Sequence, residues 1–381
     1  MSLGAGRSAV AVKRRFPVIP VLPALPVTVV VALALGLLGA CGGQDGGGGA
    51  GDGGDSINVG VLMPGGGDSR FGRFDRPLIE KQVKVLCPDC PAATVAATSD
   101  PTVQQQQFEA MITRGVDVVI LAAVDPQLMR PSVEAAHRAG IPVVAYDRLA
   151  EGPISGYVTF DGAEVGRLQA EALLKAMSAR GDGRRIVMMN GATTDPNSGW
   201  YKGGSLAVLK GRVTIGKSYD TVGWRPENAY VNMTGAIAAL GAENIDGVLS
   251  ANDSMAGAVI SALKAAKLST LPPVTGQDAD LMAVQRIVKG EQYMTVYKPY
   301  KRATDATVEM AVALGRGEKV GAIATGSVDS PTTKDVPAVL LPSVSVTVGD
   351  IGRTLVKDGM YTVNQICTPA LRPACDRAGL T

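Results

Sequence analysis

Several segments of this chain place carboxylates, amides or cations immediately after a short run of β-branched and apolar residues. Asp147 and Arg148 follow one such run at 141–146, and Asn252 follows another at 245–251. A carboxylate accepts hydrogen bonds, an arginine donates several in a fixed fork, and an asparagine does both. Such a set suits a ligand covered in hydroxyl groups. The same kind of position is occupied by Asn197, Trp224, Gln277, Asp278, Lys298 and the stretch 68-DSRFGRFDR-76.

Trp224, one of only two tryptophans in the chain, belongs to this set. It lies in 221-TVGWRPENAY-230, just before a helix that is expected to begin near Pro226. A flat aromatic face can cover the C–H face of a sugar ring while polar groups contact its edge. The alternative is that Trp224 packs as a hydrophobic staple against the following helix.

The polar residues also have purely structural interpretations. Asp147 and Asn252 could cap the helices that follow them, which is a common role for Asp and Asn at such junctions. Arg148 and Lys298 could be solvated surface charges. Their shared position at strand ends favours a binding site, because ligands of open α/β sheets bind beyond the carboxyl ends of the strands.

The composition limits the chemistry that this site can perform. The chain has one histidine, His137, so histidine-based catalysis and multi-histidine metal sites are nearly excluded. Paired carboxylates for glycoside hydrolysis remain an alternative. However, Asp147 and Asp278 each lie beside a cation or an amide donor, which suits ground-state binding better. With a net charge of +2, nothing indicates a nucleic-acid partner. We expect no catalytic residue, no metal and no cofactor.

The elements that must hold these residues alternate regularly from Ile57 onward. Short β-branched runs predict strands buried on both faces. Stretches of helical period, such as 102–115 and 161–181, lie between them. This alternation predicts parallel sheets covered by helices. One sheet would need more than about ten strands, so two doubly wound lobes are expected. The predicted strands are 57–63, 116–124, 141–146, 185–190, 213–219, 245–251, 272–276 and 293–297.

The first 55 residues differ from the rest of the chain. Basic residues precede an apolar run at 27–38, which is shorter than the roughly 20 residues of a membrane-spanning helix and suits a secretory signal. The run ends in 38-LGAC-41, which resembles a bacterial lipobox. We therefore predict a lipoprotein signal peptide at 1–40, lipidation of Cys41 and a glycine-rich tether at 41–55. The alternative is an N-terminal membrane span in which Cys41 is incidental.

Four cysteines remain after Cys41, and an even number outside the cell indicates disulfides. Three pairings are possible. Proximity in the sequence favours Cys87 with Cys90 and Cys367 with Cys375. The Cys87–Cys90 motif could also be a redox site or half of a zinc site. It lies in a proline-rich connection, however, and does not open a helix after a strand, so redox chemistry is disfavoured.

Several stretches resemble the periplasmic monosaccharide-binding proteins of ABC importers, with the D-xylose-binding members as the nearest pattern. The similarity runs from about Ile57 to at least Gly359. The matching stretches are 113-TRGVDVVI-120, 145-AYDR-148, 157-YVTFDGAEVGRLQA-170, 223-GWRPENA-229, 250-SANDSMAGAVI-260, 275-TGQDAD-280 and 294-MTVYKP-299.

This resemblance implies two α/β lobes joined by three strand crossings, with a sugar bound between them and no catalytic machinery. It implies an N-terminal lobe of 56–160 with 300–340, and a C-terminal lobe and tail of 161–298 with 341–381. The family pattern usually has Trp where this chain has Phe71, which offers a smaller apolar face. The implied sugar contacts are Arg70, Phe71, Asp147, Arg148, Asn197, Trp224, Asn252, Asp278 and Lys298.

The resemblance also implies partners and a location. It implies an exported, lipid-anchored monomer that binds a monosaccharide and docks on the transmembrane subunits of an ABC permease. A receptor for another sugar, such as glucose, galactose, ribose or a furanosyl signal, is an alternative, as is a sugar-sensing partner of a membrane signalling protein. A repressor core of the LacI type shares the fold but would need an N-terminal helix-turn-helix, where residues 1–55 resemble a signal and tether.

Overall fold

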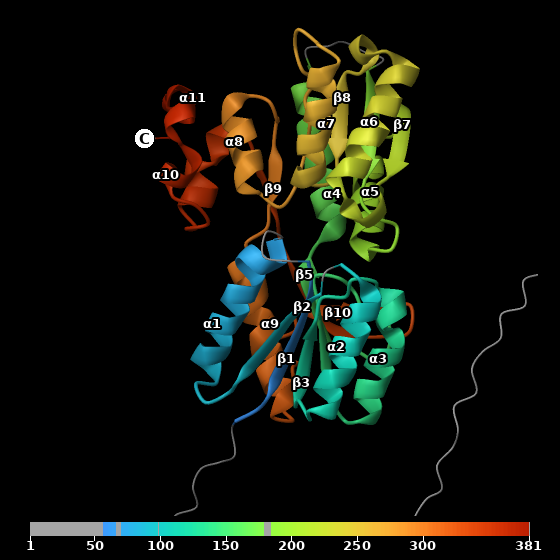
Figure 1. Cartoon of the computed structure of the whole chain (residues 1–381), viewed down its shortest axis with the longest axis vertical. Helices are drawn as coiled ribbons and strands as arrows, with labels where there is room; N and C mark the ends of the chain where they lie inside the picture. Colours follow the sequence, from blue (N-terminus) through green and yellow to red (C-terminus); the bar gives the residue numbers. More distant parts are fainter. Residues whose placement is uncertain (1–55, 66–69, 98, 179–183, 381) are drawn as a thin grey trace, which may run out of the picture. The chain divides into compact units, whose positions relative to one another are not determined.

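The computed structural model describes residues 56–65, 70–97, 99–178 and 184–380 of the 381-residue chain (Figure 1). The predicted signal peptide at 1–40, Cys41 and the tether at 41–55 lie outside the described residues. Within the described ranges, no helix has the length and apolar character that a membrane crossing requires.

The first lobe is built on a seven-stranded sheet in the order β10-β11-β5-β4-β3-β1-β2. Neighbouring strands are parallel except β10 and β11, which are antiparallel. The sheet therefore has the predicted parallel arrangement, with one antiparallel edge. Its strands are β1 (Val59–Pro64), β2 (Ala92–Ala97), β3 (Val118–Leu121), β4 (Val143–Tyr146), β5 (Gly156–Phe160), β10 (Gly326–Val328) and β11 (Val336–Leu341).

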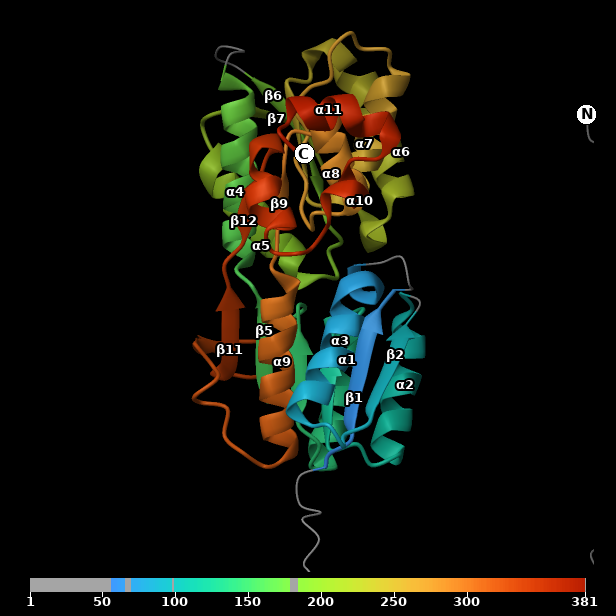
Figure 2. The same ribbon diagram turned by 90° about the vertical axis from the view of Figure 1, so that its left-hand side faces the viewer.

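Helices cover both faces of this sheet (Figures 1 and 2). Because side chains alternate along a strand, Val61 of β1 enters the apolar cluster under α1 and α9, and its neighbour Leu62 enters the one under α2 and α3. Both strand faces are buried, which explains the continuous apolar runs in the sequence. The helices are α1 (Arg76–Leu86), α2 (Pro101–Thr113), α3 (Pro126–Arg138) and α9 (Tyr300–Gly315), and a π-helical turn, η1 (Phe71–Asp75), precedes α1.

The second lobe is built on a three-stranded parallel sheet in the order β7-β6-β8, and β9 and β12 form an antiparallel pair. The chain passes between the lobes three times, from β5 to α4, from β9 to α9 and from β11 to β12. The elements are α4 (Gly162–Ala176), β6 (Arg185–Asn190), α5 (Pro196–Leu209), β7 (Thr214–Asp220), η3 (Val222–Trp224), α6 (Pro226–Leu240), η4 (Ala242–Asn244), β8 (Gly247–Ser250), α7 (Asp253–Ala265), α8 (Leu281–Lys289), β9 (Thr295–Tyr297) and β12 (Val344–Val346).

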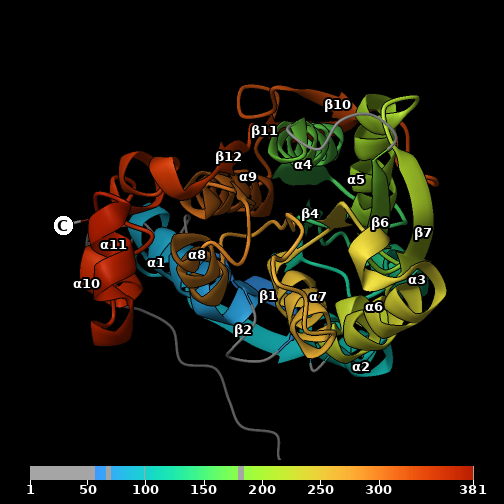
Figure 3. The same cartoon turned by 90° about the horizontal axis from the view of Figure 1, so that it is seen from above.

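A tail of short elements follows β12 and packs beside α8 (Figures 1 and 3). Its elements are η5 (Val348–Asp350), η6 (Gly352–Val356), α10 (Val363–Ile366), η7 (Pro369–Leu371) and α11 (Arg372–Arg377). A disulfide between Cys367 and Cys375 closes the segment around η7.

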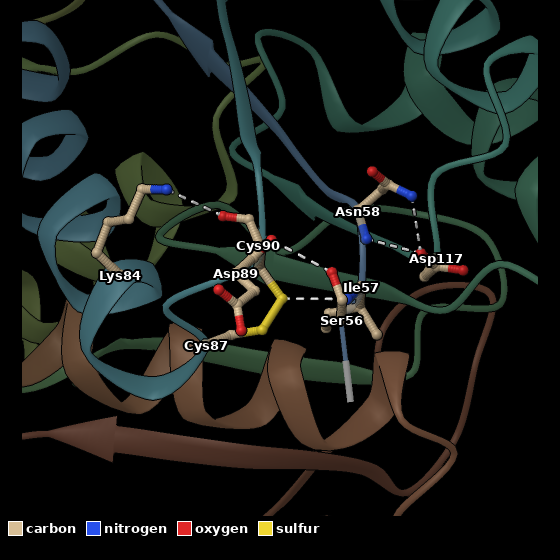
Figure 4. The surroundings of a disulfide bond; sticks show 8 residues. All are labelled: Ser56, Ile57, Asn58, Lys84, Cys87, Asp89, Cys90 and Asp117. Carbon is tan, nitrogen blue, oxygen red and sulfur yellow. Dashed lines mark hydrogen bonds between the residues drawn. A yellow bond between two sulfur atoms is a disulfide. The ribbon is translucent and has the colours of Figure 1, made fainter. Parts of the chain in front are cut away.

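The other disulfide joins Cys87 and Cys90 in the connection between α1 and β2 (Figure 4). The backbone N–H of Ile57 contacts the Cys90 sulfur at 3.0 Å, and the Ser56 hydroxyl donates to the carbonyl of Asp89 at 3.2 Å. This turn therefore holds the beginning of the described chain as it enters β1. Both bonds match the pairings favoured by sequence proximity.

The structure differs from the predicted strands in three respects. Residues 272–276 make only a single parallel bridge, at Val274. The strand predicted at 213–219 is β7, which is mostly exposed and not buried on both faces, because it is an edge strand with polar side chains. Five strands were not predicted, and they are β2, β5, β10, β11 and β12. Strand β2 is alanine-rich, β5 is a short run next to a helix, β10 and β12 have three residues each, and β11 contains Pro337.

Glycines set the close approach of α4 to α5. A Cβ atom on Gly166 would lie 2.0 Å from the carbonyl oxygen of Tyr201, and one on Gly204 would lie 2.0 Å from the carbonyl oxygen of Ala163. The Ser205 hydroxyl donates to the Gly166 carbonyl at 3.0 Å. This backbone contact fixes the position of α5, whose first turn carries Asn197.

Substitution of Gly166 by Ala tests this contact. The new methyl group collides with backbone atoms, which cannot rotate away as a side chain could. We therefore expect the free energy of unfolding to fall by roughly 2–3 kcal/mol. Gly203→Ala is the matched control in α5, because a Cβ there meets nothing within 4 Å. It should be neutral or stabilising by up to about 1 kcal/mol. Urea unfolding measures both changes, and equal stability of the two variants would contradict the packing account.

Candidate functional site

One pocket collects side chains from both lobes at the carboxyl ends of the strands. Its volume is about 260 Å³, and all nine residues named as sugar contacts line it. The first lobe contributes Arg70, Phe71, Asp147 and Arg148. The second contributes Asn197, Trp224, Asn252 and Asp278, and Lys298 lies at the crossing from β9 to α9. Their role as ligand contacts stays a prediction.

Three of these residues have left-handed backbone conformations. The φ angles are 62° at Asp147, 58° at Trp224 and 96° at Asp278. Such conformations cost non-glycine residues of order 1–3 kcal/mol each and persist only where the surroundings hold them. The backbone of Asp147 is held at its carbonyl oxygen, which accepts hydrogen bonds from the side chains of Tyr157, Thr159 and Asn197.

The capping interpretation applies to Asn252 and not to Asp147. The Asn252 side chain accepts a hydrogen bond from the N–H of Met255 at 3.0 Å, as an N-cap of α7 does. No described helix begins at Asp147, whose carboxylate instead faces Arg70. Asn252 thus combines a cap with a place in the pocket wall.

Arg70 is the centre of the first lobe's contribution. Its Nε lies 3.0 Å from an Asp75 oxygen and its Nη1 lies 3.0 Å from Asp147 Oδ1. Its guanidinium lies 4.8 Å from the ring centre of Phe71 and 4.6 Å from that of Tyr300. Burial opposes the positive charge, but the two carboxylates raise the pKa of Arg70 above its usual value.

Asp147 remains ionised at neutral pH. Burial favours its neutral form, but the cations Arg70, Lys298 and Arg148 together hold the pKa of Asp147 below its ordinary value. The carboxylate is therefore available as a hydrogen-bond acceptor in the pocket.

Lys298 is buried, with 1% of its surface exposed, which rules out a solvated surface charge. Its Nζ lies 3.1 Å from the Tyr201 hydroxyl and 3.2 Å from Asp278 Oδ1. Burial lowers the pKa of Lys298, but Tyr201 and Asp278 outweigh it and raise the pKa above the usual range. The ammonium group is a fixed charge that orients Asp278.

Several contacts join the two lobes across the pocket. Arg148 forms an ion pair with Asp195 at 2.9 Å, and the Asn197 amide donates to the carbonyl of Asp147 at 3.1 Å. The Trp224 indole N–H donates to the same Asp195 carboxylate at 3.2 Å. The described conformation is therefore one in which both lobes contact each other through the residues of the site.

Trp224 both packs and lines the pocket. Its ring meets Tyr201 edge-on with centroids 6.3 Å apart, and Gly191 leaves the space that the indole fills. Phe71 lines the same pocket from the first lobe, with the guanidinium of Arg148 5.9 Å from its ring centre. Aromatic residues of both lobes thus border the cavity, Phe71 from the first lobe and Trp224 and Tyr201 from the second. The other tryptophan, Trp200, does not line it and packs against Gly162.

Five buried polar atoms of residues that line the pocket have no hydrogen-bond partner among the described residues. Two of them, Asp147 Oδ1 and Arg148 Nε, lie 3.0 Å and 2.9 Å from an oppositely charged atom. The other three are Nη2 of Arg70, Oδ1 of Asn197 and Oε1 of Gln277. A buried polar group without a partner costs about 1–3 kcal/mol, so such groups indicate a missing ligand or water. One donor and two acceptors in one cavity match the hydroxyl groups of a polyol.

The charges around the cavity nearly balance. Three cations and four carboxylates line it, and they are Arg70, Arg148, Lys298, Asp147, Asp195, Asp278 and Asp280. This balance favours a neutral polar ligand over a strongly charged one. Within the described ranges, no group of three or more His, Cys, Asp or Glu is arranged to hold a metal ion.

Sequence reasoning missed the lining residues Asp195, Tyr201 and Asp280, and it noted Gln277 at a strand end without including it among the sugar contacts. The signal for Asp195 was present, because it precedes Pro196 as the N-cap of α5 and accepts from the Asn197 N–H at 3.0 Å. Gln277 adjoined Asp278 at the predicted strand end. Tyr201 lies inside a helix, and nothing in the sequence separates it from a core residue.

Asp280 belongs to an acidic group with Asp253 and Asp278. Burial, reinforced by Asp278, raises the pKa of Asp280 to about 6, although Arg286, Arg73 and Arg70 act against this shift. Asp253 accepts hydrogen bonds from Gln292, Thr295 and the N–H of Asp280.

Asp280→Asn tests this charge state. The pKa of Asp280 is about 6 in the folded chain and has an ordinary value of 3.8. The folded chain therefore binds this proton more tightly than the unfolded chain does. The stability that this proton adds to the folded state is lost as the pH rises from about 4 to about 6. The Asn variant lacks this loss, so we expect it to become more stable relative to wild type between about pH 4 and pH 6. Urea titrations at both ends measure the difference. A difference that does not change with pH would show that Asp280 ionises normally.

Comparison with known proteins shows the family to which this chain belongs. The profile of the periplasmic binding protein domain matches residues 59–319. The chain belongs to the periplasmic binding protein family.

The chain is 37% identical to the D-xylose-binding periplasmic protein of Escherichia coli (strain K12) over 307 residues, which cover 78% of this chain and 90% of that protein. It is 33% identical to the multiple sugar-binding periplasmic receptor ChvE of Rhizobium radiobacter, over 69% of this chain and 80% of the receptor. A solved ABC transporter solute binding protein from Clostridium phytofermentans, with bound β-D-glucose, has a TM-score of 0.75 and 28% identity, over 81% of this chain and 99% of that structure. The Clostridium structure shares the α/β fold described above.

Proposed function

We propose that this protein is an extracytoplasmic receptor that captures a monosaccharide, D-xylose, between its two lobes and delivers it to an ABC sugar importer. The proposal divides the chain into an N-terminal lobe of 56–160 with 300–340 and a C-terminal lobe and tail of 161–298 with 341–381. The nine lining residues named above are its proposed sugar contacts.

The observation that carries the proposal is the set of unpartnered polar atoms on residues that line a pocket bordered by aromatic rings. Arg70, Asn197 and Gln277 offer hydrogen bonds that the described protein groups do not use. Phe71 and Trp224 offer apolar faces from opposite lobes. A pyranose needs both, because its hydroxyls point outward around the ring and its C–H groups form the two faces.

Binding without catalysis fits the state of the carboxylates. Glycoside hydrolysis needs one carboxyl group as an acid and another as a base or nucleophile on opposite sides of a bond. Here Asp147 pairs with Arg70, Asp195 with Arg148, and Asp278 with Lys298. Each of the three carboxylates is therefore already engaged by a cation, which does not suit a free nucleophile or base. The proteins described above as relatives are binding proteins and receptors by name.

Lobe closure follows from the contacts between lobes. Arg148 and Asn197 reach residues of the opposite lobe only when the lobes are together. A sugar that contacts both lobes stabilises that state and not an open one, which is the requirement for ligand-driven closure.

The proposed cellular setting follows from the N-terminal sequence. Cys41 would carry the lipid, and the glycine-rich stretch to residue 55 would act as a tether, which places the receptor at the outer face of the cytoplasmic membrane. Its partners would be the sugar, the transmembrane subunits of the permease and the membrane itself, with the receptor acting as a monomer. Presentation of the sugar-bound form to a membrane signalling protein is the second candidate role.

The choice of D-xylose over glucose rests on the relatives. The Escherichia coli protein is named for D-xylose, whereas the Clostridium structure contains glucose. The two sugars differ by one hydroxymethyl group, and a cavity that fits the pentose would discriminate against glucose by steric overlap with that extra group.

Calorimetric titration with a panel of pentoses and hexoses tests the proposal. We expect D-xylose to bind most tightly, and Asp278→Ala or Arg148→Ala to abolish detectable binding while the fold is retained, because each removes a charged group from the pocket wall. Circular dichroism and thermal unfolding provide the control for folding. Failure of every sugar to bind would refute the receptor proposal, and tighter binding of glucose would refute the assignment to D-xylose.

Trp224→Ala tests the aromatic contribution separately. Removal of a buried aromatic contact should weaken sugar binding by roughly 1–3 kcal/mol. Trp200→Ala is the matched control, since Trp200 does not line the pocket, and its affinity should equal that of wild type. If Trp224→Ala lowered the melting temperature but left the affinity unchanged, the indole would be a packing residue only.

A further inference from the structure

We propose that the C-terminal segment 361–380 is a positioning element of the binding site, which acts through Tyr361 on the loop that carries Asp278. This inference rests on the proposed function, because Asp278 contacts a ligand only if the pocket binds one. Tyr361 does not line the pocket and is a positioning residue.

The loop 278–280 needs support from outside. Asp278 and Ala279 have φ angles of 96° and 54°, so two consecutive non-glycine residues lie in the left-handed region. Neither conformation is intrinsically favoured, and the loop keeps its shape only if surrounding groups hold it. The direction of the Asp278 carboxylate depends on that shape.

Side chains from α7, β9, α9 and the segment before α10 hold the backbone of this loop. The Tyr300 hydroxyl donates to the carbonyl of Asp278 at 2.9 Å, and the Tyr361 hydroxyl donates to the carbonyl of Ala279 at 3.0 Å. Two N–H groups of the loop are held as well. Ala279 N–H donates to the Thr295 hydroxyl at 3.1 Å, and Asp280 N–H donates to the Asp253 carboxylate at 3.0 Å.

The Tyr361 hydroxyl keeps its proton and can act as a hydrogen-bond donor. Tyr361 is 5% exposed, and burial raises the pKa of its phenol, so the hydroxyl stays protonated at neutral pH. The hydroxyl is therefore available as a donor to the Ala279 carbonyl over the whole neutral pH range.

The rest of the tail fixes Tyr361 against α8. Ile366, Leu371 and Leu380 pack in one apolar cluster with Val284 and Ile287 of that helix. The Gln285 amide donates to the Gln365 carbonyl at 3.2 Å, and the Cys367–Cys375 disulfide closes the tail on itself. Figures 1 and 3 show α10 and α11 beside α8 from two directions.

Phe74 connects Tyr361 of the tail with the first lobe. Its ring lies edge-on to Tyr361 at a centroid distance of 5.9 Å and stacked on Tyr300 at 5.7 Å. Phe74 belongs to η1, the same turn as Phe71. Tyr300 and Tyr361 therefore both contact η1, the first-lobe turn that carries Phe71. Through Tyr361, the tail contacts both the loop 278–280 and this turn.

A double-mutant cycle with D-xylose tests whether Tyr361 acts through Asp278. Tyr361→Phe keeps the ring and removes the hydroxyl, so we expect the Kd to rise roughly fivefold, as for one lost hydrogen bond. In the Asp278→Asn background the same substitution should change the Kd by less than about twofold, because the group being positioned is already altered. Tyr297→Phe is the matched control, since Tyr297 is a buried tyrosine of the same cluster whose hydroxyl faces Asp358, and its Kd should equal that of wild type.

Hydrogen exchange of the ligand-free protein gives an independent measurement when Asp278→Asn binds too weakly for the cycle. We expect the amide N–H groups of Ala279 and Asp280 to exchange faster in Tyr361→Phe and at the wild-type rate in Tyr297→Phe. Additive effects in the cycle, or equal exchange in both variants, would overturn the positioning role while sugar binding by the wild type left the proposed function intact. A wild type that binds no sugar would overturn both.

Discussion

The pairing of buried charges is the constraint on which the rest of this structure depends. Arg70, Asp147 and Lys298 are largely withdrawn from water at the point where the two lobes meet. An isolated buried charge is very costly, so each must face an opposite charge or a hydrogen-bond partner. The strand ends satisfy this requirement by bringing cations and carboxylates together from separate sheets. The outcome is a nearly neutral but highly polar cavity, which is the environment that a sugar requires.

The same constraint explains why the site is shared between lobes. Arg148 of the first lobe finds its carboxylate, Asp195, on the second, and Asn197 reaches back to the carbonyl of Asp147. In the proposed open state these groups would exchange protein partners for water. A ligand that contacts both lobes would then favour the closed state.

Much of the fold could be predicted from the sequence, because buried parallel strands appear as continuous apolar runs and helices as periodic ones. The edge strand β7 could not be recognised as exposed, since edge position depends on the strand order. Asp147, Lys298 and Trp224 were found because each follows a predicted strand. Tyr201 and the supporting role of Tyr361 could not be found in this way. Their contacts join residues about 100 and 80 positions apart, and only the folded chain brings them together.

The most direct test of the central claim is a crystal structure of the protein grown with D-xylose. The account predicts one sugar between Phe71 and Trp224, with its hydroxyls hydrogen-bonded to Arg70 Nη2, Asn197 Oδ1 and Gln277 Oε1. A sugar bound elsewhere, or one in this pocket that leaves these three atoms unpaired, would contradict it.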